Sequence, residues 1–341
     1  MIVKVRSRPF APPPRRGAAL LLALVILVLV ATTAAGMVWQ QDRSVRVEAA
    51  ERARAQAAWM LSGALDWARL ILREDLRADR ERQRGDGGRS PVDALGETWA
   101  QPLAEARLSS FLAADRDRSA DSDLEVFLSG AIEDAQARWN LRNLIGPDGK
   151  PVAAERAALR RLVDQAGAPS DTAERLERGL AAAWGPPEPT GAGAGARAEV
   201  PLAPRRLGDL RWLGIDEATL LRLAPLVTLL PVRTPVNANT ASAEVLVAAI
   251  DNIDLGSAER IVQARKRKSL GALDNLDEIR GLLPPGAEPD PQRVGVATAF
   301  FEVRGRLRLD ERVLEERSLV ERRDNEVVVW SRERVNLIDL R

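Results

Sequence analysis

The feature that most constrains this chain is a long uncharged stretch near its amino terminus, from Gly17 to Gln41. Its centre, AALLLALVILVLVA, is apolar, and about 20 apolar residues are enough for a helix to cross a bilayer. Basic residues precede the stretch: Lys4, Arg6, Arg8, Arg15 and Arg16. They favour a cytoplasmic amino terminus. A cleaved secretory signal has the same layout, with small residues from Thr33 to Ala35 for the cut, so the stretch alone leaves both interpretations open.

The residues that follow predict that the apolar segment continues as one long helix. No proline occurs from Gln40 to Arg84, and Gly63 is the only glycine there. Apolar residues recur at the spacing of one helix face: Ala50, Ala53, Ala57, Leu61, Ala64, Ala68, Ile71 and Leu72. The pattern stops at Gly85-Asp86-Gly87-Gly88, a sequence typical of a turn. At about 1.5 Å per residue the helix would be roughly 100 Å long, and a removable signal peptide has no need of such a continuation.

The composition excludes several classes of chemistry. The 341 residues include no cysteine and no histidine, so thiolate nucleophiles, Ser-His-Asp relays, CxxC redox pairs and the usual zinc sites are ruled out. Lys and Arg total 50 against 49 for Asp and Glu, and such a balance provides no overall field for nucleic acid. We therefore expect a protein that is not an enzyme.

The rest of the chain alternates between strand and helix patterns. Alternating residues predict strands within 124–145 and 299–330, while 151–184 has the spacing of helices and the following GPPEPTGAGAGARAEVPLAP predicts a flexible loop. Three further helices are expected near 243–250, 257–268 and 273–282, with Thr240 and Ser242 as capping candidates for the first. Two strand regions separated by helices predict an α+β fold in which both regions join one antiparallel sheet.

Three motifs resemble a known family. RRGAALLLALVIL resembles a type IV prepilin leader, in which a peptidase cuts after the glycine, here between Gly17 and Ala18, behind Arg15 and Arg16. The segment DAQARWNLRNL at 134–144 is similar to the "DxQGRFNLNNL" of K-type minor pseudopilins in the type II secretion pathway. Their NxNTA motif resembles these residues: Asn237, Asn239, Thr240 and Ala241. Most pilins carry Glu five residues after the cut, and Leu22 stands there in this chain, as in the K class.

The resemblance implies a pilin-like fold, with a long helix on a small antiparallel sheet and an inserted all-helical domain containing helix-hairpin-helix-like units. The implied segments are a leader (1–17), a transmembrane part (18–39), a first part of the core (40–150), the insert (151–292) and closing strands (293–341). The mature, methylated protein would lie in the bacterial inner membrane with its bulk in the periplasm.

The resemblance also implies a function and partners. The chain would cap the tip of the pseudopilus and prime its assembly for the export of folded proteins. Its partners would be prepilin peptidase and the I- and J-class minor pseudopilins. We expect the latter to contact small residues that let helices approach closely: Ala50, Ala53, Ala57, Leu61, Ala64 and Ala68. The motif of residues 237–241 would be structural, fixing a loop and capping a helix.

Two other functions remain open at the sequence level. A membrane-tethered protein for DNA uptake would use the helix-hairpin-helix pattern and the basic run 265–268 for phosphate contact. Against this, the hairpin retains only Gly256, while Asp251 and Asp254 would repel phosphate, so no nucleic acid is expected as a partner. A tip adhesin or substrate receptor is the other alternative.

The resemblance offers calcium as the one candidate cofactor. Some relatives bind calcium in the inserted domain, and carboxylates are suitable ligands for calcium. The candidates are Asp251, Asp254, Asp274 and Asp277. None of them matches a site of the family, and helix caps or surface charges are the more frequent roles of such residues.

Overall fold

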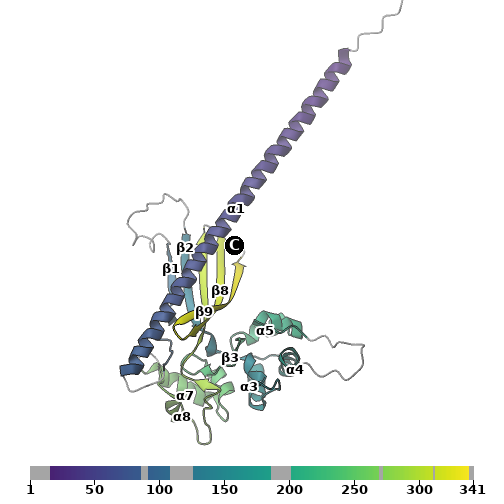
Figure 1. Cartoon of the computed structure of the whole chain (residues 1–341). Coiled ribbons are helices and arrows are strands. Elements are labelled where there is room, and N and C mark those ends of the chain that lie inside the picture. The colour runs from purple at the N-terminus through teal and green to yellow at the C-terminus, as the bar shows by residue number, and fades with distance from the viewer. Residues whose placement is uncertain are drawn as a thin grey trace, which may run out of the picture. The chain divides into compact units, whose positions relative to one another are not determined.

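The computed structural model describes residues 16–85, 91–107, 126–185, 201–268, 272–309 and 312–337. The chain forms two compact units, residues 1–59 and 60–341, and each is considered by itself. The elements are labelled in Figure 1. Helix α1 (Arg16–Gly85) continues for 70 residues and ends at the glycine where the sequence pattern stops.

The first unit contains the apolar part of α1. Its side chains are exposed in the isolated chain, as Leu22 at 62% and Trp39 at 67% illustrate. Among the described residues, α1 is the one helix with the length and composition to cross a membrane. Arg43 lies over the ring of Trp39, 5.9 Å from its centroid, and such a pair after an apolar segment is typical of a membrane–water interface.

The second unit is built on a five-stranded antiparallel sheet with the order β1-β2-β7-β8-β9. The strands are β1 (Leu103–Arg107), β2 (Val126–Asp134), β7 (Phe300–Leu309), β8 (Arg312–Arg323) and β9 (Glu326–Leu337). The early strand β2 pairs along its whole length with the late strand β7, from Val126 opposite Leu309 to Asp134 opposite Phe301. The prediction that the two regions join one sheet is therefore confirmed.

The second half of α1 packs on this sheet through one apolar face. The core between them comprises these buried residues: Leu65, Ala68, Leu72, Trp99, Ile132, Phe301, Val303, Val320 and Val327. Two glycines, Gly130 and Gly305, face each other across β2 and β7. A Cβ at Gly305 would lie 3.2 Å from Leu61 Cδ2, so the missing side chain lets the helix lie close to the strands.

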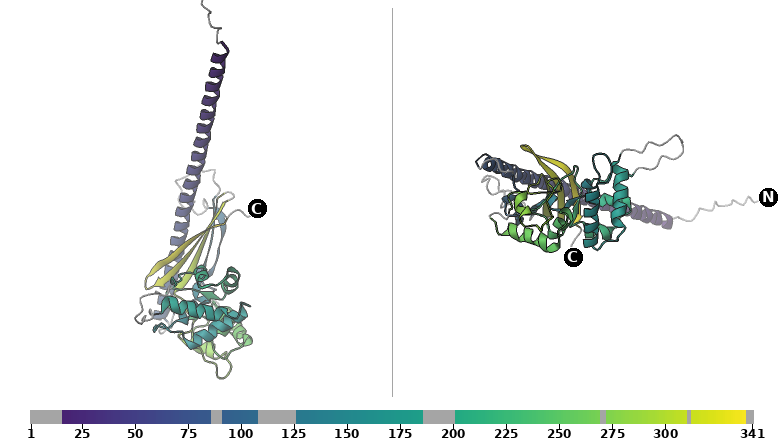
Figure 2. Two further views of the ribbon diagram at one scale, coloured as in Figure 1. Left: turned by 90° about the vertical axis from the view of Figure 1, so that its right-hand side faces the viewer. Right: turned by 90° about the horizontal axis from the view of Figure 1, so that it is seen from below.

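Helices gather at one end of the sheet, where the last turns of α1 also lie (Figures 1 and 2). They are α3 (Ala153–Gln165), α4 (Thr172–Trp184), α5 (Glu217–Leu223), α6 (Ala243–Ala249), α7 (Leu255–Lys266) and α8 (Leu276–Arg280), with the 3₁₀ segments η1 (Thr98–Ala100), η2 (Ala135–Ala137), η3 (Leu141–Leu144) and η4 (Leu207–Leu213). Helices α3 to α8 share a second hydrophobic core, which extends from Trp139 to Val296 in the sequence, whereas Trp99 of η1 belongs to the core under the sheet.

This helical part is not purely helical. Two short parallel pairs occur, β3 (Trp139–Asn140) with β4 (Val227–Thr228), and β5 (Val236–Asn237) with β6 (Val294–Gly295). Each pair joins residues that are about 60–90 positions apart, which short-range patterns do not reveal. The proposed boundaries at 151 and 292 stay predictions, and most of the expected loop, residues 186–200, falls outside the described residues.

Candidate functional site

The motif at 134–144 forms the junction between the sheet and the helices. Asp134, the last residue of β2, accepts a hydrogen bond from the backbone N–H of Gln136 at 2.7 Å and thereby caps η2. The side chain of Gln136 donates to Pro235 O at 2.9 Å and accepts from the N–H of Ala299 at 2.8 Å. One glutamine thus holds the entry to the helical part next to the return of the chain into β7.

Two asparagines of the same motif fix the segment before β5. Asn140 donates to Val232 O at 2.7 Å and accepts from the N–H of Leu230 at 3.1 Å. Asn143 makes a two-way pair with the backbone of Thr234, donating at 2.8 Å and accepting at 3.0 Å. Both asparagines are almost fully buried. Buried amides must be paired in this way to offset the loss of their hydration.

The motif at 237–241 completes this polar junction. Asn237 donates to Asp93 O at 3.0 Å and to Asp134 Oδ2 at 2.8 Å. Thr240 Oγ1 donates to the same Asp134 oxygen at 2.6 Å. Asn239 donates to Leu273 O at 3.0 Å and accepts from its N–H at 2.8 Å.

The ends of this motif differ in role. The cap of α6 is Ser242, which accepts from the N–H of Val245, so of the two capping candidates Thr240 serves the junction instead. Ala241 is fully buried, and its carbonyl accepts from Arg265 at 2.8 Å.

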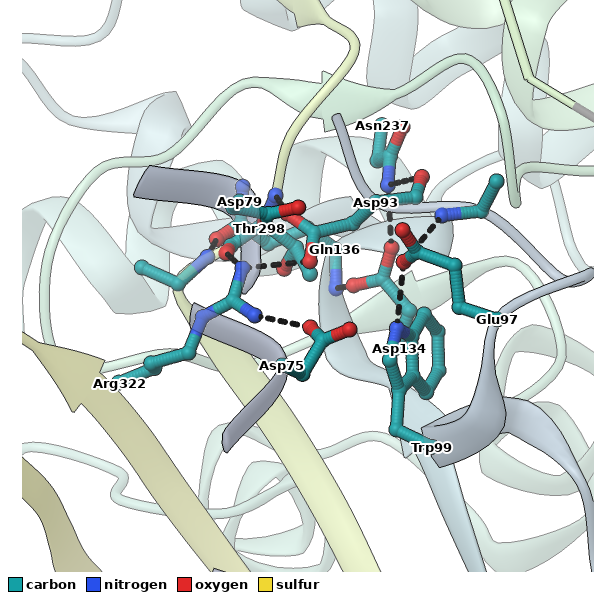
Figure 3. A network of polar contacts seen from close by, with 12 residues as sticks. Asp75, Asp79, Asp93, Glu97, Trp99, Asp134, Gln136, Asn237, Thr298 and Arg322 are labelled. Atoms are coloured by element: carbon teal, nitrogen blue, oxygen red, sulfur yellow. Dashed lines mark hydrogen bonds and ion pairs between the residues drawn. The ribbon is translucent and has the colours of Figure 1, made fainter. Parts of the chain in front are cut away.

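A cluster of charged groups lies beside the junction and is absent from the sequence predictions (Figure 3). Arg322 of β8 pairs with Asp75 of α1 at 2.7 Å and with Asp93 in the segment after α1. Asp75, Asp79 and Asp93 place carboxylate oxygens within 4.8 Å of one another. Glu97 lies close enough to raise the pKa of all three. We call these five residues the acid–arginine cluster.

Burial is the main reason for the perturbed acidity of this cluster. It raises the pKa of Asp93 to about 7 and that of Asp75 to about 6, and in both cases Arg322 offsets part of the rise. The pKa of Asp79 is also raised, by burial and then by Glu97. A carboxylate that is removed from water becomes harder to ionise unless enough positive charge surrounds it. Arg322 and Arg82 therefore do not fully offset the burial of these carboxylates.

The predicted partner-packing residues divide into two groups. Leu61 and Ala68 lie in the interior of the second unit, and Ala68 belongs to the core under the sheet. For these two residues the prediction of a free partner surface is wrong. Small side chains that would let a partner helix approach also let the chain's own sheet approach. Ala57 is also buried, at 2% exposure. The partly exposed residues of this face are Ala50, Ala53 and Ala64.

A different face of α1 carries exposed large side chains that the sequence analysis missed. Within the second unit, Trp67 is 49% exposed and Leu70 is 40% exposed. Gly63 lies one turn before Trp67, and a Cβ there would meet nothing within 4 Å. In the first unit, Trp59 is 79% exposed. Single exposed apolar residues are ordinary, but a tryptophan and a leucine beside an unconstrained glycine form a face suited to a partner helix.

The four candidate metal ligands do not form one site. Asp251 pairs with Arg161 and Arg293, each at 2.7 Å. Asp254 caps α7 through Ser257. Asp274 pairs with Lys268 at 3.5 Å, and Asp277 with Arg280 at 2.5 Å. The proposal of a metal site there is therefore withdrawn, since each carboxylate already has a cationic or backbone partner. Within the described residues, the carboxylates that do converge are Asp75, Asp79 and Asp93.

Two residues of the basic run that suggested phosphate contact, Arg265 and Lys268, have partners within the protein, while Lys266 and Arg267 are exposed. Arg265 is buried at 6% exposure and donates to the carbonyls of Ala238 and Ala241. Lys268 pairs with Asp274 and Glu278. Arg265 and Lys268 thus fix the end of α7 to its surroundings, a structural role that leaves these two cations unavailable for phosphate contact.

The processing residues lie at the edge of the description. Arg16 and Gly17 belong to the first turn of α1, and Ala18 follows them, while Arg15 falls outside the described residues. Leu22 lies in the apolar part of α1.

Comparisons with known proteins agree on one family. The family model described as "Type II secretion system (T2SS), protein K" matches residues 137–232 and 236–296 in two parts. Type II secretion system protein K of Pseudomonas aeruginosa is 32% identical over 291 residues, spanning 82% of this chain and 80% of that protein. The protein of the same description from Pectobacterium carotovorum is 28% identical over 304 residues, spanning 82% and 84%.

A solved structure shares the fold. A chain of the crystallised GspK-GspI-GspJ complex from the enterotoxigenic Escherichia coli Type 2 Secretion System superimposes with a TM-score of 0.56 at 20% identity. The match covers 84% of this chain and 98% of that one.

Proposed function

Because the chain belongs to the type II secretion system protein K family, we propose that this minor pseudopilin caps the tip of the periplasmic pseudopilus and primes its assembly. The main support for this proposal is the size and the position of the helical part. It lies at the end of the sheet where α1 terminates, since Asn237 donates to Asp93 O and Arg322 joins Asp93 to Asp75 of α1. A further subunit stacked on that end would collide with the helices, so the position with nothing above it fits this chain.

The amino-terminal residues support the same position. Other pilins are thought to use a carboxylate at the fifth mature residue to neutralise the terminal amine of a neighbour, because an unpaired charge in lipid is costly. Leu22 offers no such carboxylate, and a subunit at the tip has no neighbour ahead that requires it. Prepilin peptidase would cut between Gly17 and Ala18, and the new amino terminus would be methylated.

The family, and the one helix among the described residues that is long and apolar enough to cross a membrane, indicate a single-pass membrane anchor. We place that anchor in the bacterial inner membrane, with the amino terminus cytoplasmic and the bulk periplasmic, because basic residues precede the apolar stretch. The assembled pseudopilus would then push folded proteins towards the outer membrane.

The proposed partners are the I- and J-class minor pseudopilins, the classes crystallised together with a K-class chain in the Escherichia coli complex. In this chain the surface available to them on the second unit is the face with Gly63, Trp67 and Leu70, next to an apolar groove of 570 Å³ between α1 and the sheet. Ala50 and Ala53 are proposed as further contacts nearer the membrane.

Immunogold labelling of isolated pseudopili tests the tip position. An antibody against the helical part of this chain should label one end of each filament, whereas an antibody against the major subunit labels the whole shaft. Regular labelling of the shaft by the first antibody would refute the capping role.

Co-purification tests the partner surface. Trp67→Ala should reduce recovery of the I- and J-class subunits, whereas Trp330→Ala should not, although Trp330 of β9 is exposed to a similar extent, 45% against 49%. Equal recovery with both variants would show that the partners bind elsewhere.

A further inference from the structure

Two arginines of the helical part lie close together without a carboxylate to pair with. Arg142 belongs to η3, and Arg233 lies exposed in the segment before β5. Burial, and then the positive charge of Arg233, lower the pKa of the Arg142 guanidinium. Neither side chain forms an ion pair with any residue in the described part of the chain. Two like charges held together are unfavourable unless an anion offsets them.

The buried asparagines fix the backbone on both sides of this pair. Asn140 and Asn143 lie just before and just after Arg142 in the sequence. They bond to the backbone of the residue before Arg233 at 2.7 Å and of the residue after it at 2.8 and 3.0 Å. The two arginines are thus brought together by a rigid part of the molecule, and a preorganised pair loses little conformational freedom when it binds a ligand.

An aromatic ring supports the partly buried member of the pair. The Cζ atom of Arg142 lies 4.6 Å from the centroid of the Trp184 ring, at the last residue of α4. The Nη1 atom of Arg142 is buried and makes no hydrogen bond with the residues that the structure describes. The guanidinium is therefore held by its face and not by an acceptor. A guanidinium that packs on an aromatic ring keeps the N–H groups in its plane for other partners.

The surroundings favour a carboxylate as the ligand. A planar carboxylate accepts two parallel hydrogen bonds from one guanidinium. The carbonyl end of α4, where Trp184 lies, carries a partial negative charge, which opposes a doubly charged phosphate more than a singly charged carboxylate. Val232, next to Arg233, is 46% exposed. Tryptophan and arginine together are typical of the centre of a protein–protein interface, so we expect the carboxylate to belong to a protein.

We propose that Arg142 and Arg233, with Trp184 packed against Arg142, bind an Asp or Glu side chain of a partner protein. None of these residues belongs to the α1 face proposed above for the minor pseudopilins, so the site would receive a different contact. The proposal also does not depend on the tip position, because it rests on the two arginines and their surroundings alone.

Fluorescence anisotropy of a labelled hexaglutamate peptide, titrated with the full-length chain in detergent at low salt, tests this site. Arg142→Gln should weaken binding about tenfold, since it removes a charge-assisted hydrogen bond. Arg233→Gln, at a more exposed side chain, should weaken it about threefold or more. The control is Arg160→Gln, because Arg160 of α3 is exposed and has no ion pair among the described residues. This variant should change the affinity less than about twofold.

Thermal unfolding separates loss of the site from loss of the fold. Arg233→Gln relieves the repulsion between the arginines, so without peptide its Tm should equal or exceed that of the wild type. This variant therefore tests the site even if Arg142→Gln does not fold. A clearly lower Tm for Arg233→Gln would contradict the proposal, because Arg233 would then have a structural role within the chain.

Three binding results would also overturn the proposal. Arg233→Gln could bind hexaglutamate as tightly as the wild type does. A hexaglutamine peptide could bind as well as hexaglutamate, in which case the carboxylates are not recognised. Inorganic phosphate could displace the peptide at a lower concentration than acetate does, which would indicate a phosphate site instead.

Discussion

Two buried polar regions meet at the end of the sheet, and they offset the loss of hydration of their polar groups in different ways. In the amide network, Asn140, Asn143, Asn237 and Asn239 each donate and accept hydrogen bonds. The acid–arginine cluster instead relies on charges, and it leaves Asp79 Oδ2 without a partner.

The difference shows what each region contributes. An amide carries donors and acceptors in one neutral group, so a few backbone partners satisfy it at any pH. Carboxylates need a cation or a proton, and their contribution therefore depends on pH and on dissolved ions. We expect the amide network to act as a permanent fastening between sheet and helices, and the acid–arginine cluster to be conditional.

Removing the arginine should have the largest effect. Arg322→Met leaves Asp75 and Asp93 without their cation, and breaking a buried ion pair in this way costs about 3–5 kcal/mol. Chemical denaturation at pH 7.5 would measure it. The neighbouring Arg323, whose side chain is 57% exposed, is the control, and Arg323→Met should change the free energy of unfolding by less than about 0.5 kcal/mol. Equal losses for both variants would mean that the cluster is not buried in solution.

The amide network should come next. Asn239→Leu leaves the carbonyl and the N–H of Leu273 without their side-chain partner, and buried groups without partners cost about 1–3 kcal/mol each. We expect a loss of about 2–4 kcal/mol, the same at pH 5.5 and pH 8. Gln263→Ala, on the exposed side of α7, should be neutral. A pH-dependent loss in Asn239→Leu would abolish the distinction between the two regions.

The change in the wild-type free energy of unfolding with pH should be smaller than the losses in these two variants. Since the pKa of Asp93 is raised to about 7 and that of Asp75 to about 6, the folded protein binds protons more tightly than the unfolded chain. Protonation of these two carboxyl groups therefore stabilises the folded state at low pH, and this stabilisation is lost as the pH rises through about 6–7. In EDTA, these two groups should make the free energy of unfolding about 2 kcal/mol lower at pH 8 than at pH 5.5. Asp79→Asn should flatten this dependence, and an unchanged profile would contradict the assignment.

An ion pair nearer the surface should matter least. Asp251 pairs with Arg161 and Arg293 but its side chain remains 47% exposed, so Asp251→Asn should cost only about 1 kcal/mol. Asp254 and Asp277 are available as comparisons at still more exposed sites. If Asp251→Asn lowered the free energy of unfolding as much as Arg322→Met does, solvent exposure would not explain the difference in strength between the two ion pairs.

Much of this fold could be predicted from the sequence, because its signals are local. The end of α1 follows from a glycine-rich turn at Gly85, and the pairing of β2 with β7 follows from a shared alternation. The residues of the amide network could also be identified from the sequence, since its asparagines lie in two short motifs.

The acid–arginine cluster gave no such signal. Its residues come from α1, the segment after it and β8, and each is an ordinary Asp, Glu or Arg in its own surroundings. Only the packing of α1 on the sheet brings Asp75 within reach of Arg322. The same packing explains the error at Leu61 and Ala68, because a face of small and apolar residues does not specify whether a partner or the chain's own sheet covers it.

The mature amino terminus tests the central claim most directly, since the assembly account requires that α1 keep its apolar part after the leader is removed. Intact-mass and amino-terminal sequencing of the protein purified from membranes should give a start at Ala18, with one added methyl group. A start near Gly36 would contradict the account, because the apolar part of α1 would then be a discarded signal.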